Sequence, residues 1–371
     1  MAEPLKNRYG PEVPRRIGTM LVAAWPRFPT RAFLADALAG YEALELMPRA
    51  RQVAAAMHRH LPQDYPRAIS ILLDSLGPRS PHTSDLGLGS FLYLPHVFFV
   101  AAHGLGHFEE SMRAQYELTR RFTAEFSIRA YLVHHREATL ARLAQWSEDP
   151  DVHVRRLVSE GTRPRLPWAP RLREFQRDPT PVLDLLERLR DDPELYVRRS
   201  VANNLNDIGK DHPQRLVDVA RRWMRGATPQ RRWIVGHALR SAIKRADPGA
   251  LAVMGFGAGT PVKLRAVSIV PARPRLGGAV TLGFELHNAS HQPQRVLADL
   301  RVHFVKSSGD TGPKVFKLKA VALEPGASVA LRKTISLAPL TTRKHYAGQH
   351  RVEALLNGEP RALGSFELRG A

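Results

Sequence analysis

A short pattern occurs twice in the chain, once as SEDPDVHVRRLVSE and once as RDDPELYVRRSVAN. The two copies align Asp149 with Asp192, and in both a valine and two arginines follow at the same distance, with an offset of 43 residues. A period of roughly 40 to 47 residues is typical of repeats in which pairs of helices stack on their neighbours. The pattern therefore predicts a helical solenoid of the HEAT type.

The sequence around this repeat also predicts helices. Apolar residues recur at spacings of three and four in segments such as FTAEFSIRAYLVHH and QRLVDVARRWM, which gives each segment one buried stripe. Capping residues next to prolines mark helix starts at Asp64, Thr180 and Thr228. A weaker third copy of the repeat, at 229–232, keeps the two arginines and lacks the aspartate. We predict an all-α HEAT-like domain over residues 1–257.

Beyond a glycine-rich segment at 255–261, the pattern changes from helices to strands. Apolar and polar residues alternate in segments such as AVTLGFELHNAS, as expected for strands with one buried face. Hairpin turns are predicted at Asn357-Gly358 and Pro325-Gly326. About seven short strands in roughly 110 residues are typical of an immunoglobulin-like sandwich. The chain is therefore predicted to be multidomain, with an all-β sandwich over residues 258–371.

The charge of the chain restricts its partners. There are 55 basic and 35 acidic residues, a net charge of +20, and the predicted sandwich alone holds 17 basic and 7 acidic residues. Such a field attracts polyanions, so we expect both domains to contact the same polyanion, a nucleic acid rather than a lipid. The absence of cysteine excludes disulfides and thiolate metal sites. Without a signal-type or membrane-spanning apolar run, we expect a soluble intracellular protein with no membrane partner.

The paired arginines of the repeat have two interpretations. They could form a salt-bridged helix face with the acidic residues around them, including Asp149 and Asp191. Their recurrence at the same repeat position instead favours contacts with a phosphate backbone. The residues that we predict to bind DNA are Arg155, Arg156, Arg163, Arg165, Arg198, Arg199, Asn203, Arg231 and Arg232.

Three acidic residues stand out in the same region. Glu125 lies among apolar residues, where a carboxylate is costly unless it is used or paired. Arg129 follows four residues later and could be its partner. Glu160 occupies the place in the first repeat that Asn203 occupies in the second, so both are expected on the surface of the arginines. Asp207 follows one helical turn after Asn203, on the same face.

Two further features of the sequence could form binding sites. Trp168 lies in RPRLPWAPR, between two prolines, as either a loop anchor or an exposed aromatic surface for a base or a cation. His103 and His107 have a spacing at which two rings on a helix could share a metal. The two glycines between them weaken that helix, so we expect no metal and interpret the glycines as permitting close approach.

Several long segments of this chain resemble the bacterial DNA alkylation repair glycosylases, and specifically the AlkC branch of the AlkC/AlkD superfamily. These segments are YEALELMPRARQVA, FTAEFSIRAYL, RRLVSEGTRPRLPWAPRL and DDPELYVRRSVANNLNDIGKDHP. The resemblance covers nearly all of residues 5–260, and the C-terminal domain looks like the extension found in part of that branch. It implies excision of 3-methyladenine, 3-methylcytosine and 1-methyladenine from duplex DNA.

The resemblance also implies which residues act. The catalytic carboxylates fall on Glu125 and Asp207, whereas Trp168 and Glu160 would lie at the damaged nucleotide. A base with a positive charge is already a good leaving group, so carboxylates need only stabilise the oxocarbenium-like sugar and position water. No cofactor is expected, and no lysine nucleophile is evident, so a lyase step is not expected. The alternative is a non-catalytic HEAT scaffold that binds DNA or an acidic protein.

Overall fold

The computed structural model describes residues 5–80, 88–257, 259–339 and 344–370. The chain forms two compact units, one of Met1–His212 with Ala227–Ala238 and one of Pro213–Gly226 with Leu239–Ala371. Helices come first and strands second, which confirms the predicted order of an all-α repeat region and an all-β sandwich. No helix in the described segments is both long and apolar enough to cross a membrane.

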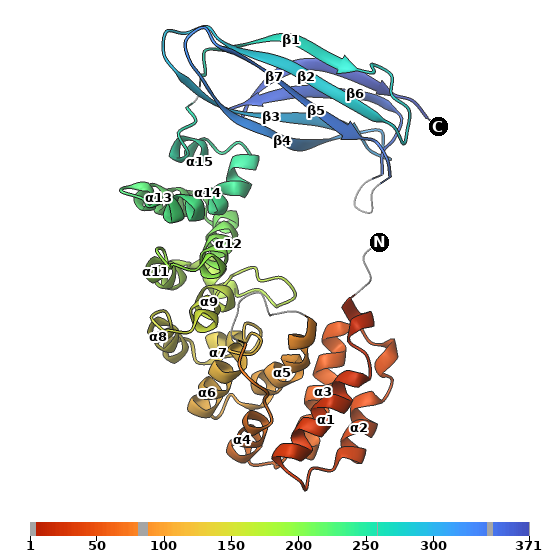
Figure 1. Ribbon diagram of the computed structural model, residues 1–371, viewed down its shortest axis with the longest axis vertical. Helices are drawn as coiled ribbons and strands as arrows, with labels where there is room; N and C mark the ends of the chain where they lie inside the picture. Colours follow the sequence, from red (N-terminus) through yellow and green to blue (C-terminus); the bar gives the residue numbers. More distant parts are fainter. Residues whose placement is uncertain (1–4, 81–87, 258, 340–343, 371) are drawn as a thin grey trace. The chain divides into compact units, whose positions relative to one another are not determined.

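The first unit is built from helices joined mostly by short connections, with a longer loop at 162–172 (Figure 1). Its three-residue and four-residue apolar spacings produce one buried stripe per helix, such as Val197, Val201 and Leu205 on α12. The α-helices of this unit are α1 (Glu12–Ala24), α2 (Thr30–Leu38), α3 (Leu46–His60), α4 (Tyr65–Asp74), α5 (Leu94–His103), α6 (Phe108–Thr119), α7 (Ile128–His134), α8 (Arg136–Trp146), α9 (Val152–Gly161), α10 (Arg173–Arg177), α11 (Thr180–Arg188), α12 (Leu195–Asp211) and the first part of α14 (Pro229–Lys244).

The two copies of the repeat fold in the same way. In each, the aspartate of the Asp-Pro pair accepts a hydrogen bond from a backbone N–H two residues later, at 2.8 Å for Asp149 and 2.9 Å for Asp192. The first arginine then donates to the carbonyls of that turn: Arg155 to residues 149 and 150, and Arg198 to residues 192 and 193. The first arginine of the motif therefore closes the turn that precedes its own helix.

The second unit contains α13 (Pro213–Met224), the end of α14 (Pro229–Lys244), α15 (Pro248–Val253) and the sandwich. The change from helix to strand falls between Val253 and Val262, and a domain boundary at 257/258 stays a prediction. One sheet has the order β1-β2-β5 and the other β4-β3-β6-β7, all antiparallel. The strands are β1 (Val262–Val270), β2 (Ala279–Asn288), β3 (Gln294–Val305), β4 (Thr311–Leu323), β5 (Ser328–Ser336), β6 (Gly348–Leu356) and β7 (Glu359–Leu368).

Only one of the two predicted hairpin turns joins paired strands. Asn357 and Gly358 both have positive φ, 47° and 85°, and connect β6 to its partner β7. Pro325 and Gly326 were predicted to form a second hairpin, and this prediction was wrong. They connect β4 to β5, which belong to different sheets, and the N–H of Gly326 donates to the carbonyl of Asn288 instead. A Pro-Gly pair indicates a turn but does not indicate which strands will pair.

The β6–β7 turn also attaches the sandwich to the helices of its own unit. The side-chain amide of Asn357 donates to the carbonyl of Gly257 and to the hydroxyl of Thr260, both at 2.7 Å. A Cβ at Gly358 would lie 2.7 Å from the Cβ of Ala246 at the end of α14. Close contact at this glycine and the hydrogen bonds of Asn357 thus hold the linker before β1 against the sandwich.

Candidate active site

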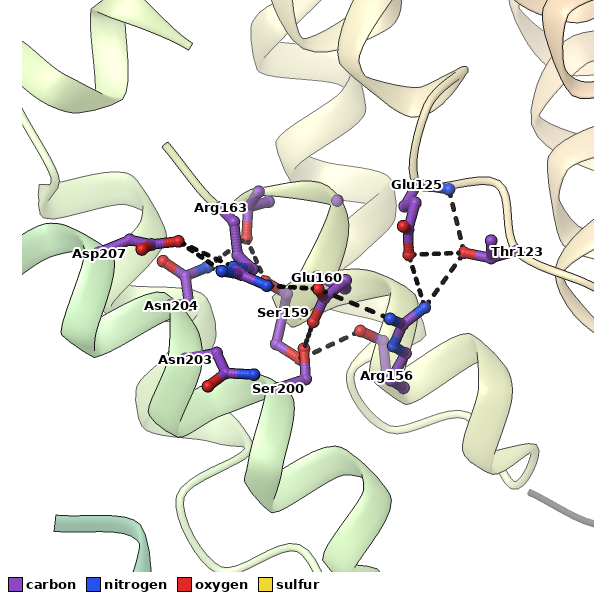
Figure 2. A network of polar contacts seen from close by, with 12 residues as sticks. Thr123, Glu125, Arg156, Ser159, Glu160, Arg163, Ser200, Asn203, Asn204 and Asp207 are labelled. Atoms are coloured by element: carbon purple, nitrogen blue, oxygen red, sulfur yellow. Dashed lines mark hydrogen bonds and ion pairs between the residues drawn. The ribbon is translucent and has the colours of Figure 1, made fainter. Parts of the chain in front are cut away.

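Glu125 and Arg156 form an ion pair between the segment before α7 and the middle of α9 (Figure 2). The Nη1 of Arg156 donates to Oε2 of Glu125 at 2.7 Å and to the hydroxyl of Thr123 at 3.2 Å. That hydroxyl donates to the same carboxylate oxygen at 3.0 Å. Glu125 was predicted to need a partner, and Arg156, rather than the nearby Arg129, provides the ion pair.

Glu160 lies at the end of α9 and connects this pair to a second arginine. Its Oε1 accepts a hydrogen bond from Arg163 at 2.6 Å and lies 3.6 Å from Arg156, while its Oε2 accepts one from Ser200 at 2.5 Å. Burial by itself raises the pKa of Glu160, but Arg156, Arg163 and Ser200 outweigh it and hold the pKa below its usual value. Glu160 is therefore a negatively charged carboxylate although it is buried.

Asp207 continues the network on α12. Its Oδ2 accepts a hydrogen bond from Nε of Arg163 at 2.8 Å, and its Oδ1 accepts one from Lys210 at 2.8 Å. Asn204, on the same helix, donates to the carbonyl of Ser159 and so ties α12 to α9. The result is a chain of three carboxylates that alternate with two guanidinium groups.

The three carboxylates differ in exposure. The side chain of Glu125 is 13% exposed, against 8% for Glu160 and 2% for Asp207. Among the described residues, hydrogen bonds and ion pairs reach both oxygens of Glu160 and of Asp207, but only Oε2 of Glu125. Glu125 is thus the carboxylate with an oxygen left to act on another group.

The sequence predicted some of these positions and missed others. Glu160 was expected on the same face as the arginines and Asn203. It does contact Arg156 and Arg163, but Ser200 of α12 also binds it, and only 6% of Glu160 is exposed. Asn203 is half-buried, and its amide oxygen lies 3.3 Å from Nε2 of His237. Ser200 was missed because a hydroxyl carries no charge that marks it. Lys210 was missed too, although its spacing of three residues from Asp207 is a known signal for a helical ion pair.

Trp168 extends from the loop between α9 and α10. Its side chain is 60% exposed and its φ is 64°, a left-handed backbone conformation that is unusual for a bulky residue. It lines a cavity of about 520 Å³ together with Phe98, Phe126 and the guanidinium of Arg129. Of the two sequence interpretations, the structure favours the exposed aromatic surface. Glu125 does not line this cavity, although Phe126, the next residue in the chain, does.

Most of the arginines predicted to bind phosphate already have partners inside the protein. Asp211 accepts a hydrogen bond from Nε of Arg165 at 2.9 Å, and Asp191 accepts one from Nε of Arg231 at 2.7 Å. Partners within the described chain are also found for Arg155, Arg156, Arg163 and Arg198. Arg199 and Arg232 are exposed. Binding of DNA by these arginines and by Asn203 stays a prediction.

The two histidines with metal-like spacing serve the packing of helices. His107 stacks on Tyr65 with the ring centres 5.1 Å apart. A Cβ at Gly104, just after His103, would lie 2.3 Å from the hydroxyls of both Ser111 and Tyr65, so the glycine permits a close approach. No three histidine, aspartate or glutamate side chains among the described residues are grouped so that they could hold a metal ion.

Two family models match this chain, one in the helical region and one in the β-sandwich. The model described as DNA alkylation repair enzyme matches residues 122–242, which include Glu125, Glu160, Trp168 and Asp207. The model described as the C-terminal Ig-like domain of the uncharacterised protein YhaZ matches residues 263–370. The helical repeats, the sandwich and the acidic site thus indicate the class of DNA alkylation repair enzymes.

Two similar proteins extend this comparison over the whole chain. The uncharacterized protein YhaZ of Bacillus subtilis (strain 168) is 36% identical over 365 residues, which cover 98% of this chain and 99% of that protein. A solved structure of the Pseudomonas fluorescens alkylpurine DNA glycosylase AlkC, bound to DNA containing an abasic site analogue, is 40% identical. It matches 99% of this chain and 100% of its own length with a TM-score of 0.88. The chain therefore belongs to the AlkC family of DNA alkylation repair glycosylases.

Proposed function

We propose that this protein is a monofunctional DNA glycosylase that hydrolyses the N-glycosidic bond of cationic N-alkylated bases in duplex DNA, as the first step of base excision repair. Its proposed substrates are 3-methyladenine, 3-methylcytosine and 1-methyladenine. The observation that carries this proposal is the chain of carboxylates and guanidiniums that ends at Glu125, the residue before Phe126, which lines the same cavity as Trp168. The similarity to an alkylpurine DNA glycosylase supports the same reaction.

Glu125 is the proposed residue closest to the reacting sugar. As the glycosidic bond breaks, its electron pair goes to the alkylated base, which leaves neutral, and positive charge develops on the sugar. A carboxylate near that charge stabilises it and can take a proton from the attacking water. Glu125 fits because it is the most exposed of the three carboxylates and its Oε1 is not engaged within the described chain.

Asp207 is the proposed second catalytic carboxylate, and Glu160 the proposed acidic residue at the lesion. Both oxygens of each are bonded inside the protein, and both hold Arg163. Because Asp207 is almost fully buried, the assignment of Glu125 rests on stronger structural support. Arg156, Arg163 and Lys210 neutralise the three carboxylates as a group, so selectivity for a cationic base would come from the oxygen of Glu125 that has no partner among the described residues.

Trp168 is proposed to contact the damaged nucleotide. The face of an indole is negative, and a cation above it gains about 0.5 to 2 kcal/mol. The large exposure of Trp168 leaves this face accessible. Arg199 and Arg232 are exposed, and we propose them as the phosphate contacts of the helical unit. The other predicted arginines would bind phosphate only if they released the acidic or carbonyl groups that they now contact.

Three finer points belong to the same proposal, and one alternative competes with it. We propose that the enzyme acts as a monomer in the cytoplasm and that the sandwich also contacts DNA. A non-catalytic scaffold for DNA or an acidic protein is the alternative, but such a scaffold gains nothing from Glu125 and Asp207 beside its arginines. Family membership supports the enzyme over the scaffold.

The test uses duplexes that each carry one defined base: 3-methyladenine, 3-methylcytosine, 1-methyladenine or an undamaged purine. Abasic sites are scored as strand breaks after alkali, with a parallel sample left untreated. We expect breaks in the alkylated duplexes only, and only after alkali, because a monofunctional enzyme leaves the backbone intact. Absence of excision from every duplex would refute the enzymatic proposal, and breaks without alkali would refute the monofunctional one.

A further inference from the structure

Trp168 is held in place although most of its surface is exposed. The indole is 60% exposed, and its backbone adopts a φ of 64° in a loop that has no helix or strand between Gly161 and Arg173. A left-handed conformation of a bulky residue is strained and persists only if the surrounding structure holds it. Contacts made by the rest of the loop must therefore hold this conformation, and they include its backbone carbonyls as well as the buried Leu166 and Leu172.

Arg129, on α7, supplies that constraint. Its Nη1 donates to the carbonyls of Gly161 at 3.1 Å and Arg163 at 2.7 Å, and its Nη2 donates to the carbonyl of Pro170 at 2.5 Å. One guanidinium therefore joins the start of the loop to a residue two positions after Trp168. The side chain of Arg163 in turn binds Glu160 and Asp207. The guanidinium of Arg129 therefore joins the loop of Trp168 to a residue of the carboxylate network.

The placement of a cation here has a cost. Arg129 is 5% exposed, and burial lowers its pKa to about 10, despite the opposing effect of Glu125. Its Nε is buried without a hydrogen-bond partner among the described residues. A buried charge that pairs with carbonyls rather than a carboxylate is an expensive way to hold a loop. It is justified if the position of the loop matters for the reaction.

We propose that Arg129 is a positioning residue for base excision, which sets the position of Trp168 relative to the carboxylates by clamping the backbone of residues 161–170. This inference rests on the proposed function, in which Trp168 contacts the damaged nucleotide. Arg129 does not touch the substrate in this account. Its contribution to the rate passes through Trp168 and not through Arg163 and the carboxylates, so removal of Arg129 has no further effect once the indole is gone.

The test is a double-mutant cycle on single-turnover excision of 3-methyladenine with Arg129→Met, Trp168→Ala and the double variant. Arg129→Met keeps the length of the stem and removes all three clamping bonds. Because its effect passes through Trp168, Arg129→Met should slow excision by no more than loss of the indole does, which is about twofold to thirtyfold. The double variant should be no slower than Trp168→Ala. Losses that multiply would overturn the proposal.

Arg49 offers a matched control. It is 7% exposed and also donates to four backbone carbonyls, those of residues 6, 9, 42 and 44. Arg49→Met removes a buried clamp of the same kind in another part of the unit, so its effect should multiply with that of Trp168→Ala. If Arg129→Met does not stay folded at the assay temperature, Arg129→Lys replaces it, because an ammonium cannot bridge three carbonyls in a fixed fork.

A second readout does not depend on activity. With 5-fluorotryptophan incorporated, the ¹⁹F signal of Trp168 is assigned by its loss in Trp168→Phe. Arg129→Met should shift or broaden that signal alone, and Arg49→Met should leave it in place. An unchanged Trp168 signal would overturn the proposal. If the parent protein excises no base, the proposed function fails, and the ¹⁹F measurement still decides whether Arg129 positions Trp168.

Discussion

The Nε of Arg155 lies 2.7 Å from Oδ2 of Asp192, so a residue of the first repeat binds the Asp-Pro turn of the second. Both side chains are shielded, with 13% and 3% exposure. In the second repeat, Nε of Arg198 is buried without a partner among the described residues. The third copy of the pattern lacks the aspartate, so the acceptor that would continue the series is missing from the sequence.

The Arg155–Asp192 contact predicts a difference in stability between two equivalent arginines. Arg155→Met leaves a buried carboxylate unpaired, which typically costs about 3 to 5 kcal/mol. Arg198→Met removes the same type of side chain but leaves no unpaired acid, so its cost should be clearly smaller. Urea unfolding of both variants measures the difference. Equal losses would show that the bond between the repeats contributes nothing beyond the turn.

Glu125→Gln tests the proposed role of the most exposed carboxylate. The amide keeps the shape of the side chain but cannot stabilise positive charge on the sugar, so we expect the single-turnover excision rate to fall by about a hundredfold to a thousandfold. Affinity for DNA with an abasic site analogue should change little, because that DNA is already past the chemical step. A rate equal to that of the parent protein contradicts the assignment.

Glu109 provides the control for this substitution. It also pairs with an arginine, Arg142, at 2.7 Å, but it is exposed at the start of α6. Glu109→Gln should therefore leave excision and DNA affinity unchanged. If it lowers the rate as much as Glu125→Gln does, the effect reflects net charge rather than a position near the sugar.

Glu160 and Pro325 show what could not be predicted from the sequence. The period of the repeat placed Glu160 beside Asn203 in register, but register does not show that α12 lies over the end of α9 and that Ser200 covers the carboxylate. Likewise, Pro325 and Gly326 marked a turn without showing which sheet the next strand joins. Local pattern determines the elements, whereas burial and pairing depend on neighbours that are distant in sequence.

The role of the arginines could not be predicted from the sequence either. Their recurrence predicted a phosphate-binding surface, and a salt-bridged helix face was the alternative. Arg155, Arg156 and Arg163 turn out to be engaged by buried acids. A list of charges does not distinguish these uses, because the choice depends on whether an acidic partner is brought within hydrogen-bonding distance by packing.

Trp168→Ala should separate activity from stability. The indole is 60% exposed, so its removal should change the free energy of unfolding by less than about 0.5 kcal/mol. Loss of a cation–π contact of about 0.5 to 2 kcal/mol should slow excision of 3-methyladenine by roughly twofold to thirtyfold. Trp168→Phe, with a weaker aromatic face, should have an excision rate between those of the parent protein and Trp168→Ala. A large loss of stability with unchanged excision would make Trp168 a loop anchor after all.

His96 predicts a dependence of stability on pH. It is fully buried in α5, neither ring nitrogen has a hydrogen-bond partner within the described chain, and burial lowers its pKa to about 4. The unfolded chain takes up the proton near pH 6.5, before the folded protein does. The free energy of unfolding should therefore fall by about 3 kcal/mol as pH drops from about 6.5 to 4. His96→Phe should remove that part of the slope, and an unchanged slope would contradict this.

The sandwich is expected to share in DNA binding, and two of its surfaces can be compared directly. Lys317 and Lys319 are exposed on β4, and Lys263 and Arg265 are exposed on β1, in the other sheet. Glutamine at both positions of one pair removes two cations without touching the core. Each lost phosphate contact lowers the slope of log affinity against log salt by about 0.9, so the pair that faces DNA should reduce it by about 2. The other pair is then the control, and unchanged slopes for both pairs would place these two surfaces outside the DNA contact.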